Sequence, residues 1–469
     1  MARRLPGAVL AALSALVLLS LAACTDGDGA RQPPDADDRR RIVVASGQDV
    51  TGKNGIRQQL IDVWNADQGP QGYVARLVEL PGSADQQRSQ LLGALQSGSA
   101  EYDVVNLDVT WVPEFAEAGL IRPLTDAAVK SPEDIIRSVD KTSFWKGKRY
   151  AVPFNSDAGL LYYRKDHLGD AGVFETDLSG GVTWDELREQ IDAVKSDSGH
   201  GNEGWSTQLA PYEGRTVNAI EAFTSAVPGL RLTDGEGEYA ATVEQLTAGV
   251  AELRERTAPP YTLDDASESR EAESLSAFAE GRTTFLRHWP YVYPTLHETY
   301  GEKLGVARLP GKAVLGGQNL AVTSSASERR AAKAAELIAF LTDPDSERCL
   351  LRAGFAATRV SAYQEPDVAP RCRHAQAYAE TPSASPTGEG TLQSPPDQNA
   401  EGVSFSRDIL LPALREGVHR PRTPLYGAVT HTLITELDPL FGRSGGEGRA
   451  DAAEVAENLD EELRKILPG

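Results

Sequence analysis

The feature of this chain that most constrains its fold is a regular alternation of strand-like and helix-like segments between residues 42 and 107. The run 42–45 is short and apolar, as in a buried strand, and 73–80 and 102–107 are rich in strand-forming residues. Apolar residues recur at helical spacing in the two intervening segments, at Ile56, Leu60, Ile61 and Trp64 and at Leu91, Leu92 and Leu95. This order predicts an α/β fold in which helices cover a mostly parallel sheet.

Polar residues follow two of these predicted strands at the point where each strand ends. Gln48 and Asp49 come after the first strand, and Asp108 opens the segment 108–111 after the third. Ligands of open parallel sheets bind beyond the carboxyl ends of the strands. These segments are therefore candidate binding positions.

The later part of the chain shows further elements. A polar connector at 155–159 separates strand-like runs at 150–154 and 160–163. We predict three helices from their caps and periodicity, opening at Thr183 with Glu186 at the capping-box spacing, spanning 332–341, and running from Asp451 to Leu467. The Pro-, Ser- and Gly-rich stretch 381–402 predicts a mobile insertion.

The N-terminus has the pattern of a bacterial lipoprotein signal. Arg3 and Arg4 precede the apolar stretch 9–21, which is too short for a comfortable membrane span but suits a secretion signal. The stretch ends in Leu-Ala-Ala-Cys, in which small residues admit the signal peptidase and Cys24 receives the lipid. We predict a signal peptide over 1–23, a flexible tether over 24–41, and anchoring to the outer face of the cell membrane. A plain signal peptide or an anchor helix is the alternative.

Charge and composition exclude some classes of partner. The formal net charge is −21, and removing residues 1–23, which carry two arginines, makes it −23. The phosphate groups of nucleic acid would repel such an acidic chain, so we expect no nucleic-acid partner. No cysteine or histidine cluster has metal-ligand spacing, and we predict neither a metal nor a cofactor.

Two cysteines remain once Cys24 is lipidated. Cys349 and Cys372 form an even pair in an oxidising compartment, which predicts one disulfide. Two free buried thiols are the alternative.

Segments from residue 42 to about 360 occur in the order found in a known family. They lie at 102–124, 147–166, 278–291, 305–322 and 331–354, and the stretch 421–426 looks like a closing segment. In this order the chain resembles the bacterial extracellular solute-binding proteins that serve ATP-driven sugar importers. The segments 108–111, 155–159 and 211–215 are similar to those of the trehalose- and maltose-type binding lipoproteins. One departure is Gln318, where disaccharide-binding relatives often carry a tryptophan.

The resemblance implies a two-lobed periplasmic-binding-protein fold of type II, with hinge-linked lobes and a ligand cleft between them. Lobe 1 would comprise 42–156 and 311–356, and lobe 2 would comprise 157–310 and 357–469. It also implies a monomer that binds a sugar, such as trehalose or maltose, and docks on the permease subunits of an ABC transporter.

The chemistry of sugars selects the candidate site residues. Sugars present hydroxyl groups at the ring edge and C–H patches on the ring faces, so polar side chains and aromatic rings bind them together. The candidates are Gln48, Asp49, Asp108 and Trp111 in lobe 1, Asn155 and Asp157 in the connector, Tyr212, Glu213, Trp289 and Tyr291 in lobe 2, and Gly317 with Gln318 after the second crossing.

Each candidate also has a purely structural interpretation. Asp49 can be a helix cap, Trp111 and Trp289 can be core residues, Asn155, Asp157 and the 316–317 glycine pair can shape turns, and Glu213 can be a solvated charge.

At the level of function, we expect no enzyme. A glycoside hydrolase that uses Asp108 and Glu213 is one alternative, because that chemistry needs a carboxylate pair. A ligand sensor on the same fold and a binder of a non-sugar solute are others.

Overall fold

The computed structural model describes residues 40–48, 55–69, 72–98, 102–125, 128–196, 204–364, 371–372, 397–441 and 450–469. The predicted signal peptide, Cys24, Asp49, nearly all of the tether and residues 381–396 of the predicted insertion lie outside these ranges.

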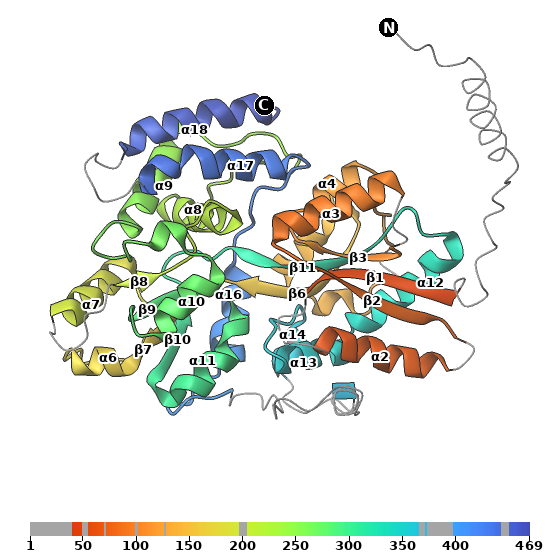
Figure 1. Cartoon of the computed structure of the whole chain (residues 1–469), viewed down its shortest axis with the longest axis horizontal. Helices are drawn as coiled ribbons and strands as arrows, with labels where there is room; N and C mark the ends of the chain where they lie inside the picture. The colour runs from red at the N-terminus through yellow and green to blue at the C-terminus, as the bar shows by residue number, and fades with distance from the viewer. Residues whose placement is uncertain are drawn as a thin grey trace, which may run out of the picture. The chain divides into compact units, whose positions relative to one another are not determined.

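The first lobe is built on a five-stranded sheet with the strand order β2-β1-β3-β11-β6 (Figure 1). Its strands are β1 (Arg41–Gly47), β2 (Val74–Leu80), β3 (Val104–Asp108), β6 (Val152–Ala158) and β11 (Leu315–Val322). Strands β1 and β3 are parallel, but β11 runs antiparallel to both β3 and β6. Strands β1, β3 and β6 therefore run in one direction, as expected for a mostly parallel sheet, and β11 is the exception because it enters the sheet from the other half of the chain.

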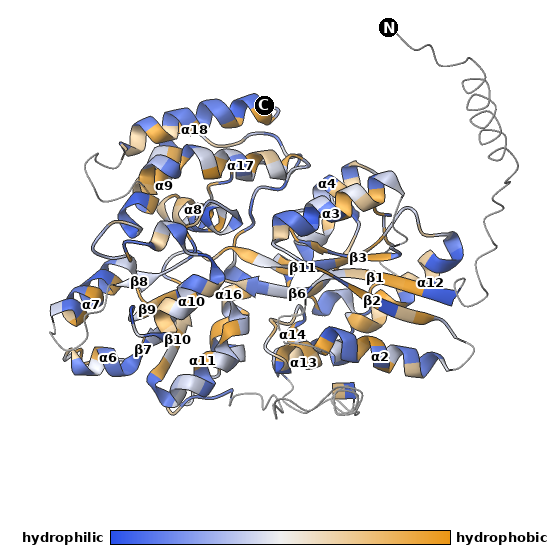
Figure 2. Ribbon diagram, in the orientation of Figure 1, coloured by the Kyte–Doolittle hydropathy of each residue, from blue (hydrophilic) through white to orange (hydrophobic). Residues whose placement is uncertain are grey.

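Apolar residues alternate between the two faces of this sheet, as the two-residue period of a strand requires. Val44 and Val104 join one core cluster, whereas Ala45 and Val105 join another. Helices α2 (Ile56–Gln68), α12 (Glu328–Leu341) and α13 (Pro344–Arg352) contribute to the first cluster, and α3 (Ala84–Ser97) and α4 (Val112–Glu117) to the second. Figure 2 shows β1 and β3 as largely apolar and α3 as largely hydrophilic.

The second lobe is built on a four-stranded sheet with the order β10-β7-β9-β8. Its strands are β7 (Leu160–Arg164), β8 (Trp205–Ser206), β9 (Phe285–His288) and β10 (Leu304–Arg308). The helices of this half are α6 (Lys165–Asp170), α7 (Trp184–Ser196), α8 (Glu213–Ala226), α9 (Val243–Arg256), α10 (Glu271–Ala279) and α11 (Tyr293–Tyr300). Near the C-terminus, α17 (Tyr426–Glu436) and α18 (Ala452–Ile466) pack with α8 and α9 around one apolar cluster (Figure 1).

Several shorter helices and strands lie between these elements. They are α5 (Arg137–Asp140), the hairpin β4 (Phe144–Trp145) and β5 (Lys148–Arg149), α14 (Val360–Gln364) and α16 (Leu411–Glu416). The two sheets with their helices confirm the predicted α/β class.

The chain crosses between the two sheets at Gly159 and again over residues 309–314. The predicted connector at 155–159 is wrong in extent, because residues 155–158 belong to β6 and pair with β11. Only Gly159 separates β6 from β7, and a Cβ atom there would lie 2.6 Å from Glu221 Oε1 and 2.8 Å from Arg287 Nη2. Glycine is therefore required at this crossing, since a side chain would collide with a buried ion pair.

The helix caps read from the sequence are confirmed. The Thr183 backbone N–H donates to Glu186 Oε2 at 2.8 Å, and the Glu186 N–H donates back to Thr183 Oγ1 at 3.2 Å. Asp451 accepts from the backbone N–H groups of residues 453 and 454 at the start of α18. The bonds are reciprocal at Thr183 and run one way into Asp451, and in both helices they satisfy N–H groups that have no partner within the helix.

Cys349 and Cys372 are bonded to each other in the structure, with their Cα atoms 5.2 Å apart. The bond joins α13 to residues 371–372 inside the apolar cluster of the first lobe. Within the described ranges, no helix is both long and apolar enough to cross a bilayer.

Candidate functional site

Two predicted site residues from different lobes meet at one arginine. Asp108 ends β3, Glu213 opens α8, and the guanidinium of Arg420 lies between them. Arg420 Nη1 is 2.6 Å from Glu213 Oε1, and Nη2 is 3.0 Å from Asp108 Oδ1. The Arg420 side chain is only 4% exposed, so the bridge is a buried contact between the lobes.

Further donors hold both carboxylates in place. Glu213 also accepts from Thr430 Oγ1 at 2.9 Å and from the hydroxyl of Tyr426, both from α17. Asp108 accepts from the backbone N–H and the hydroxyl of Thr110, at 2.9 and 2.8 Å. Burial raises the pKa of Glu213 against the opposing charge of Arg420. Both acceptors are thus positioned before any ligand binds.

Asp157 presents a carboxyl group that has no partner within the part of the chain that the structure describes. It lies on β6 opposite Gly316 of β11, and no described side chain forms a hydrogen bond or ion pair with it. Burial raises its pKa to about 7, which Arg57, Arg287 and Arg420 oppose and Asp108 reinforces. This carboxyl group is therefore placed near the charges of both lobes and retains its full capacity for hydrogen bonding.

The predicted aromatic face adjoins Asp157. A Cβ atom added at Gly316 would lie 3.1 Å from Asp157 Cβ and 3.4 Å from Trp289 Cζ3, so the glycine lets the ring approach the carboxyl group. On lobe 2, the Arg287 guanidinium lies 3.9 Å from the centroid of the Trp289 ring. Burial raises the pKa of Tyr291, and the Asp157 charge adds to that shift. Asp157 and Trp289 therefore both adjoin Gly316, whereas the ring of Tyr291 packs edge to face against His288.

A buried arginine organises the remaining polar candidates. Arg57 on α2 donates to Gln318 Oε1 at 2.7 Å and to Asn155 Oδ1 at 3.3 Å. Gln318 also accepts from Asn106 Nδ2 at 2.7 Å. The side-chain oxygens of Gln318 and Asn155 thus bind the protein itself, and their amide groups support the wall of the site.

The other candidates lie in different surroundings. Gln48 is exposed at the end of β1, and Trp111 is 6% exposed within the apolar cluster beside α4. The ring of Tyr212 packs against the guanidinium of Arg270, 4.9 Å from the ring centroid. The structure therefore brings together Asp108, Glu213, Asp157 and Trp289, whereas Trp111 serves as a core residue.

Sequence reasoning missed Arg420 and Arg57. Arg420 immediately precedes the recognised stretch 421–426, which was a usable signal for a role at the site. Arg57 had no comparable signal, because an arginine within a helical pattern usually lies on the solvated face.

Gly317 is expected to tolerate no side chain. Its φ is +105°, and a Cβ atom would lie 2.3 Å from the carbonyl oxygen of Asn155. We predict that Gly317→Ala lowers the free energy of unfolding by about 1 to 3 kcal/mol, the scale of local backbone strain, as measured by urea denaturation. Gly119→Ala is the matched control, because Gly119 also has positive φ (+65°) but open space around it. Equal losses in both variants would contradict a steric role for Gly317.

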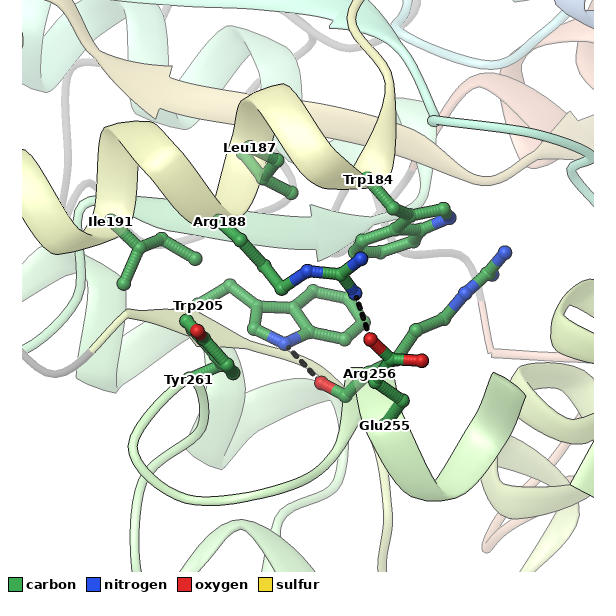
Figure 3. A pocket seen from close by; sticks show the side chains of 8 residues that line it. All are labelled: Trp184, Leu187, Arg188, Ile191, Trp205, Glu255, Arg256 and Tyr261. Carbon is green, nitrogen blue, oxygen red and sulfur yellow. Dashed lines mark hydrogen bonds and ion pairs between the residues drawn. The ribbon is translucent and has the colours of Figure 1, made fainter. Parts of the chain in front are cut away.

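A small pocket in lobe 2 lies between α7, β8 and the end of α9, and its lining contains none of the predicted site residues (Figure 3). Trp184 and Trp205 meet edge to face there with centroids 5.0 Å apart, and Arg256 lies 4.2 Å from the Trp184 centroid. Arg188 pairs with Glu255 at 3.2 Å, and Arg256 pairs with Glu252 at 2.6 Å. The free volume is about 10 Å³, which is room for one water molecule and not for a sugar.

Comparisons with known proteins point to one family. The profile of the bacterial extracellular solute-binding proteins matches residues 60–375. A probable ABC transporter-binding protein of Deinococcus radiodurans is 27% identical over 317 residues, which cover 63% of this chain and 72% of that protein.

Two solved structures have the same fold. Maltose-bound MalE3 of T. maritima aligns with a TM-score of 0.70 at 23% identity, over 91% of this chain and all of the other. The GacH receptor of Streptomyces glaucescens, solved unliganded and with acarbose, aligns with a TM-score of 0.69 at 19% identity, over 91% and 98%. These alignments confirm the predicted two-lobed fold of type II.

Proposed function

Because the chain belongs to the bacterial extracellular solute-binding protein family, we propose that it captures a sugar between its lobes and delivers it to an ABC importer. The observation that carries the proposal is the carboxyl group of Asp157, which has no hydrogen-bond or ion-pair partner among the described residues and lies, like the ring of Trp289, beside Gly316. A free acceptor next to an aromatic face matches the edge and the face of a pyranose ring.

The remaining residues fit the same ligand class. Among the described residues, Asp108 Oδ2 accepts one bond, from Arg420, and Glu213 Oε2 accepts one bond, from Thr430, so each oxygen keeps a lone pair for a sugar hydroxyl, and its charge strengthens that bond. A hydrolase needs an acid and a base whose pKa values differ. Asp108 and Glu213 are poor candidates for these roles, because both are paired with the same guanidinium. We expect the protein to return a disaccharide uncut.

The ligands of the structural neighbours support a disaccharide or a larger sugar. One neighbour is bound to maltose and another to acarbose. We propose trehalose or maltose as the sugar. Gln318 stands where many disaccharide-binding relatives have tryptophan, so Trp289 supplies the stacking face in this chain.

We propose that the protein acts as a monomer outside the cytoplasm, held to the outer face of the membrane by a lipid on Cys24. Its family is extracellular. The sequence before Cys24 supports the anchor. On this proposal the ligand stabilises the closed arrangement of the lobes, and that form docks on the permease.

A thermal-shift screen against mono- and disaccharides tests the proposal. We expect at least one neutral sugar to raise the melting temperature, and calorimetry to give one site per chain. A chain that binds amino acids or phosphodiesters and none of the sugars would overturn the assignment.

We predict that Trp289→Ala weakens sugar binding by about 1 to 3 kcal/mol, the scale of a lost aromatic contact. The measurement is calorimetric titration with the sugar found in the screen. Trp184→Ala is the matched control, since that ring packs against Arg256 in the pocket of Figure 3 and its loss should leave the affinity for the sugar unchanged. Equal affinities of wild type and Trp289→Ala would remove Trp289 from the site.

Sugar affinity should also depend on pH through Asp157, whose pKa is raised to about 7. The ionised carboxylate is the stronger acceptor, so the sugar favours that form and affinity rises with pH. Below this pKa the competent fraction falls tenfold per unit, so the dissociation constant at pH 6 should be about ten times its limiting value. Titrations from pH 5.5 to 8.5 check this, and Asp157→Asn should flatten the profile. A wild-type profile as flat as that of the variant would contradict the role of Asp157.

A further inference from the structure

Arg287 packs against the ring that the proposed site offers to a sugar. Its guanidinium lies 3.9 Å from the centroid of the Trp289 ring and so covers one face of the indole. The Arg287 side chain is 1% exposed, whereas Trp289 is only partly buried. An indole has two faces, so one face of Trp289 is left for a ligand and the other is occupied by a cation of the protein itself.

Glu221 and Gln208 fix the orientation of this guanidinium. Glu221 accepts from Arg287 Nη2 at 2.6 Å and from Nε at 3.1 Å, which is the two-point geometry of an arginine–carboxylate pair. Gln208 accepts from Arg287 Nη1 at 3.2 Å, and its amide nitrogen donates to the backbone carbonyl of Arg287 at 2.9 Å. These bonds hold a planar group inside lobe 2, so the plane against which the Trp289 ring packs is fixed.

The same ion pair contacts both crossings between the lobes. At the first crossing, a Cβ atom on Gly159 would lie 2.6 Å from Glu221 Oε1 and 2.8 Å from Arg287 Nη2. At the second crossing, the backbone N–H of Val314 donates to Glu221 Oε1 at 3.0 Å. When two lobes close on a ligand, the segments that join them absorb the change in backbone angles. The pair that orients the ring therefore also touches the segments on which closure depends.

We infer that Arg287 is a positioning residue, which holds the ring of Trp289 in the orientation that stacks on a sugar and links this ring to both crossings. The inference rests on the proposed function and deepens it, because it connects binding at the ring with closure of the lobes. Arg287 acts through Trp289 and Glu221 and does not itself touch the ligand. A sugar stacked on Trp289 thereby stabilises the arrangement of the crossings that packs against the ion pair.

Arg287→Lys tests the inference in the full chain. Lysine keeps a positive charge beside Glu221 but has neither the flat face that packs on an indole nor the two-point fork. Arg256→Lys is the matched control, because Arg256 is also buried, is also paired with a carboxylate, and lies 4.2 Å from the Trp184 centroid in the pocket of Figure 3. Arg287→Lys is also made in the Trp289→Ala background.

The first measurement needs no ligand. Near-UV circular dichroism reports the surroundings of tryptophan rings, so Arg287→Lys should change the spectrum of the wild type and leave that of Trp289→Ala unchanged. Far-UV circular dichroism checks that each variant is folded. Equal spectral changes in both backgrounds, or no change in the wild type, would overturn the positioning role.

The second measurement is calorimetric titration with the sugar found in the screen. Arg287→Lys should weaken binding about ten-fold in the wild type, the scale of a cation–π contact, but less than about two-fold in Trp289→Ala. A residue that acts through a ring has no effect once the ring is gone, so the two substitutions should not be additive. Arg256→Lys should leave the affinity unchanged. A ten-fold loss in both backgrounds is the result of a general structural role and overturns the inference.

Small-angle scattering at saturating sugar tests the link to the crossings. Wild type and Arg256→Lys should become more compact with sugar, whereas Arg287→Lys should keep a larger radius of gyration with its site occupied. Full compaction of Arg287→Lys contradicts the link between the ring and the crossings. If no sugar binds the wild type, the proposed function fails, and the spectra recorded without ligand decide the positioning role alone.

Discussion

We expect Arg287→Met to lower the free energy of unfolding by about 3 to 5 kcal/mol, the cost of breaking a buried ion pair from one side. Arg287 lies on β9 and Glu221 on α8, and their side chains are 1% and 3% exposed. Arg287 Nη2 is 2.6 Å from Glu221 Oε1, and Nε is 3.1 Å from Glu221 Oε2. Methionine fills similar space but leaves the Glu221 carboxylate buried without its counter-charge.

Neither partner can regain water without unfolding, because both lie inside lobe 2. The Glu221 carboxylate also accepts from the backbone N–H of Val314 at 3.0 Å, and Gln208 Oε1 accepts from Arg287 Nη1 at 3.2 Å. Through Val314, the pair thus holds residues 309–314, where the chain crosses between the lobes for the second time, against α8. Its loss should also disturb Trp289, whose ring faces the Arg287 guanidinium.

Urea denaturation of Arg287→Met, of Glu221→Gln and of the double variant measures the effect on the free energy of unfolding. Arg287→Met/Glu221→Gln should recover part of the loss, because it removes the stranded charge. Arg282→Met is the exposed control, since the Arg282–Asp265 pair is 46% and 52% exposed and should contribute less than about 1 kcal/mol. If Arg287→Met loses no more unfolding free energy than Arg282→Met, then charge attraction between Arg287 and Glu221 is not what stabilises this part of lobe 2.

Local pattern was sufficient to predict much of the fold. The strands β1 and β3 and the helices α2 and α3 follow from apolar periodicity, and α7 and α18 follow from their caps. These features depend on residues within one or two turns of each other. The antiparallel entry of β11 and the strand conformation of residues 155–158 were not predicted, because both depend on pairing between distant segments.

In the candidate site, too, some residues could be predicted from the sequence and others could not. Residue type and position after a strand singled out Asp108, and resemblance singled out Glu213 and Trp289. The partner of the two carboxylates lies 312 residues beyond Asp108, and no local rule connects such positions. Trp111 shows the converse case, because a tryptophan after a strand has the same sequence pattern whether it faces a ligand or packs in the core. Only the packing of α4 distinguishes the two.

The second large effect is expected for Arg420→Met, which removes the cation shared by Asp108 and Glu213. The two carboxylates then face each other across the boundary with no counter-charge, at a cost of about 3 to 5 kcal/mol to the closed form. Opening the lobes returns both groups to water, so most of this cost appears as opening and less as unfolding. We therefore predict a larger radius of gyration for the ligand-free variant in small-angle scattering. Sugar affinity should fall about 100-fold or more, because the ligand must first restore the closed form.

Comparison with Arg287→Met distinguishes a bridge between lobes from a core ion pair. If Arg420→Met loses as much unfolding free energy as Arg287→Met, with unchanged radius and affinity, then the bridge stabilises the fold and does not control closure. Neutralising the stranded carboxylates by adding Asp108→Asn and Glu213→Gln should restore the smaller radius. It should not restore sugar affinity, since the amides are weaker acceptors for sugar hydroxyls than the carboxylates they replace. Recovery of compactness without recovery of binding would therefore separate the charge balance that closes the lobes from the acceptors that hold the sugar.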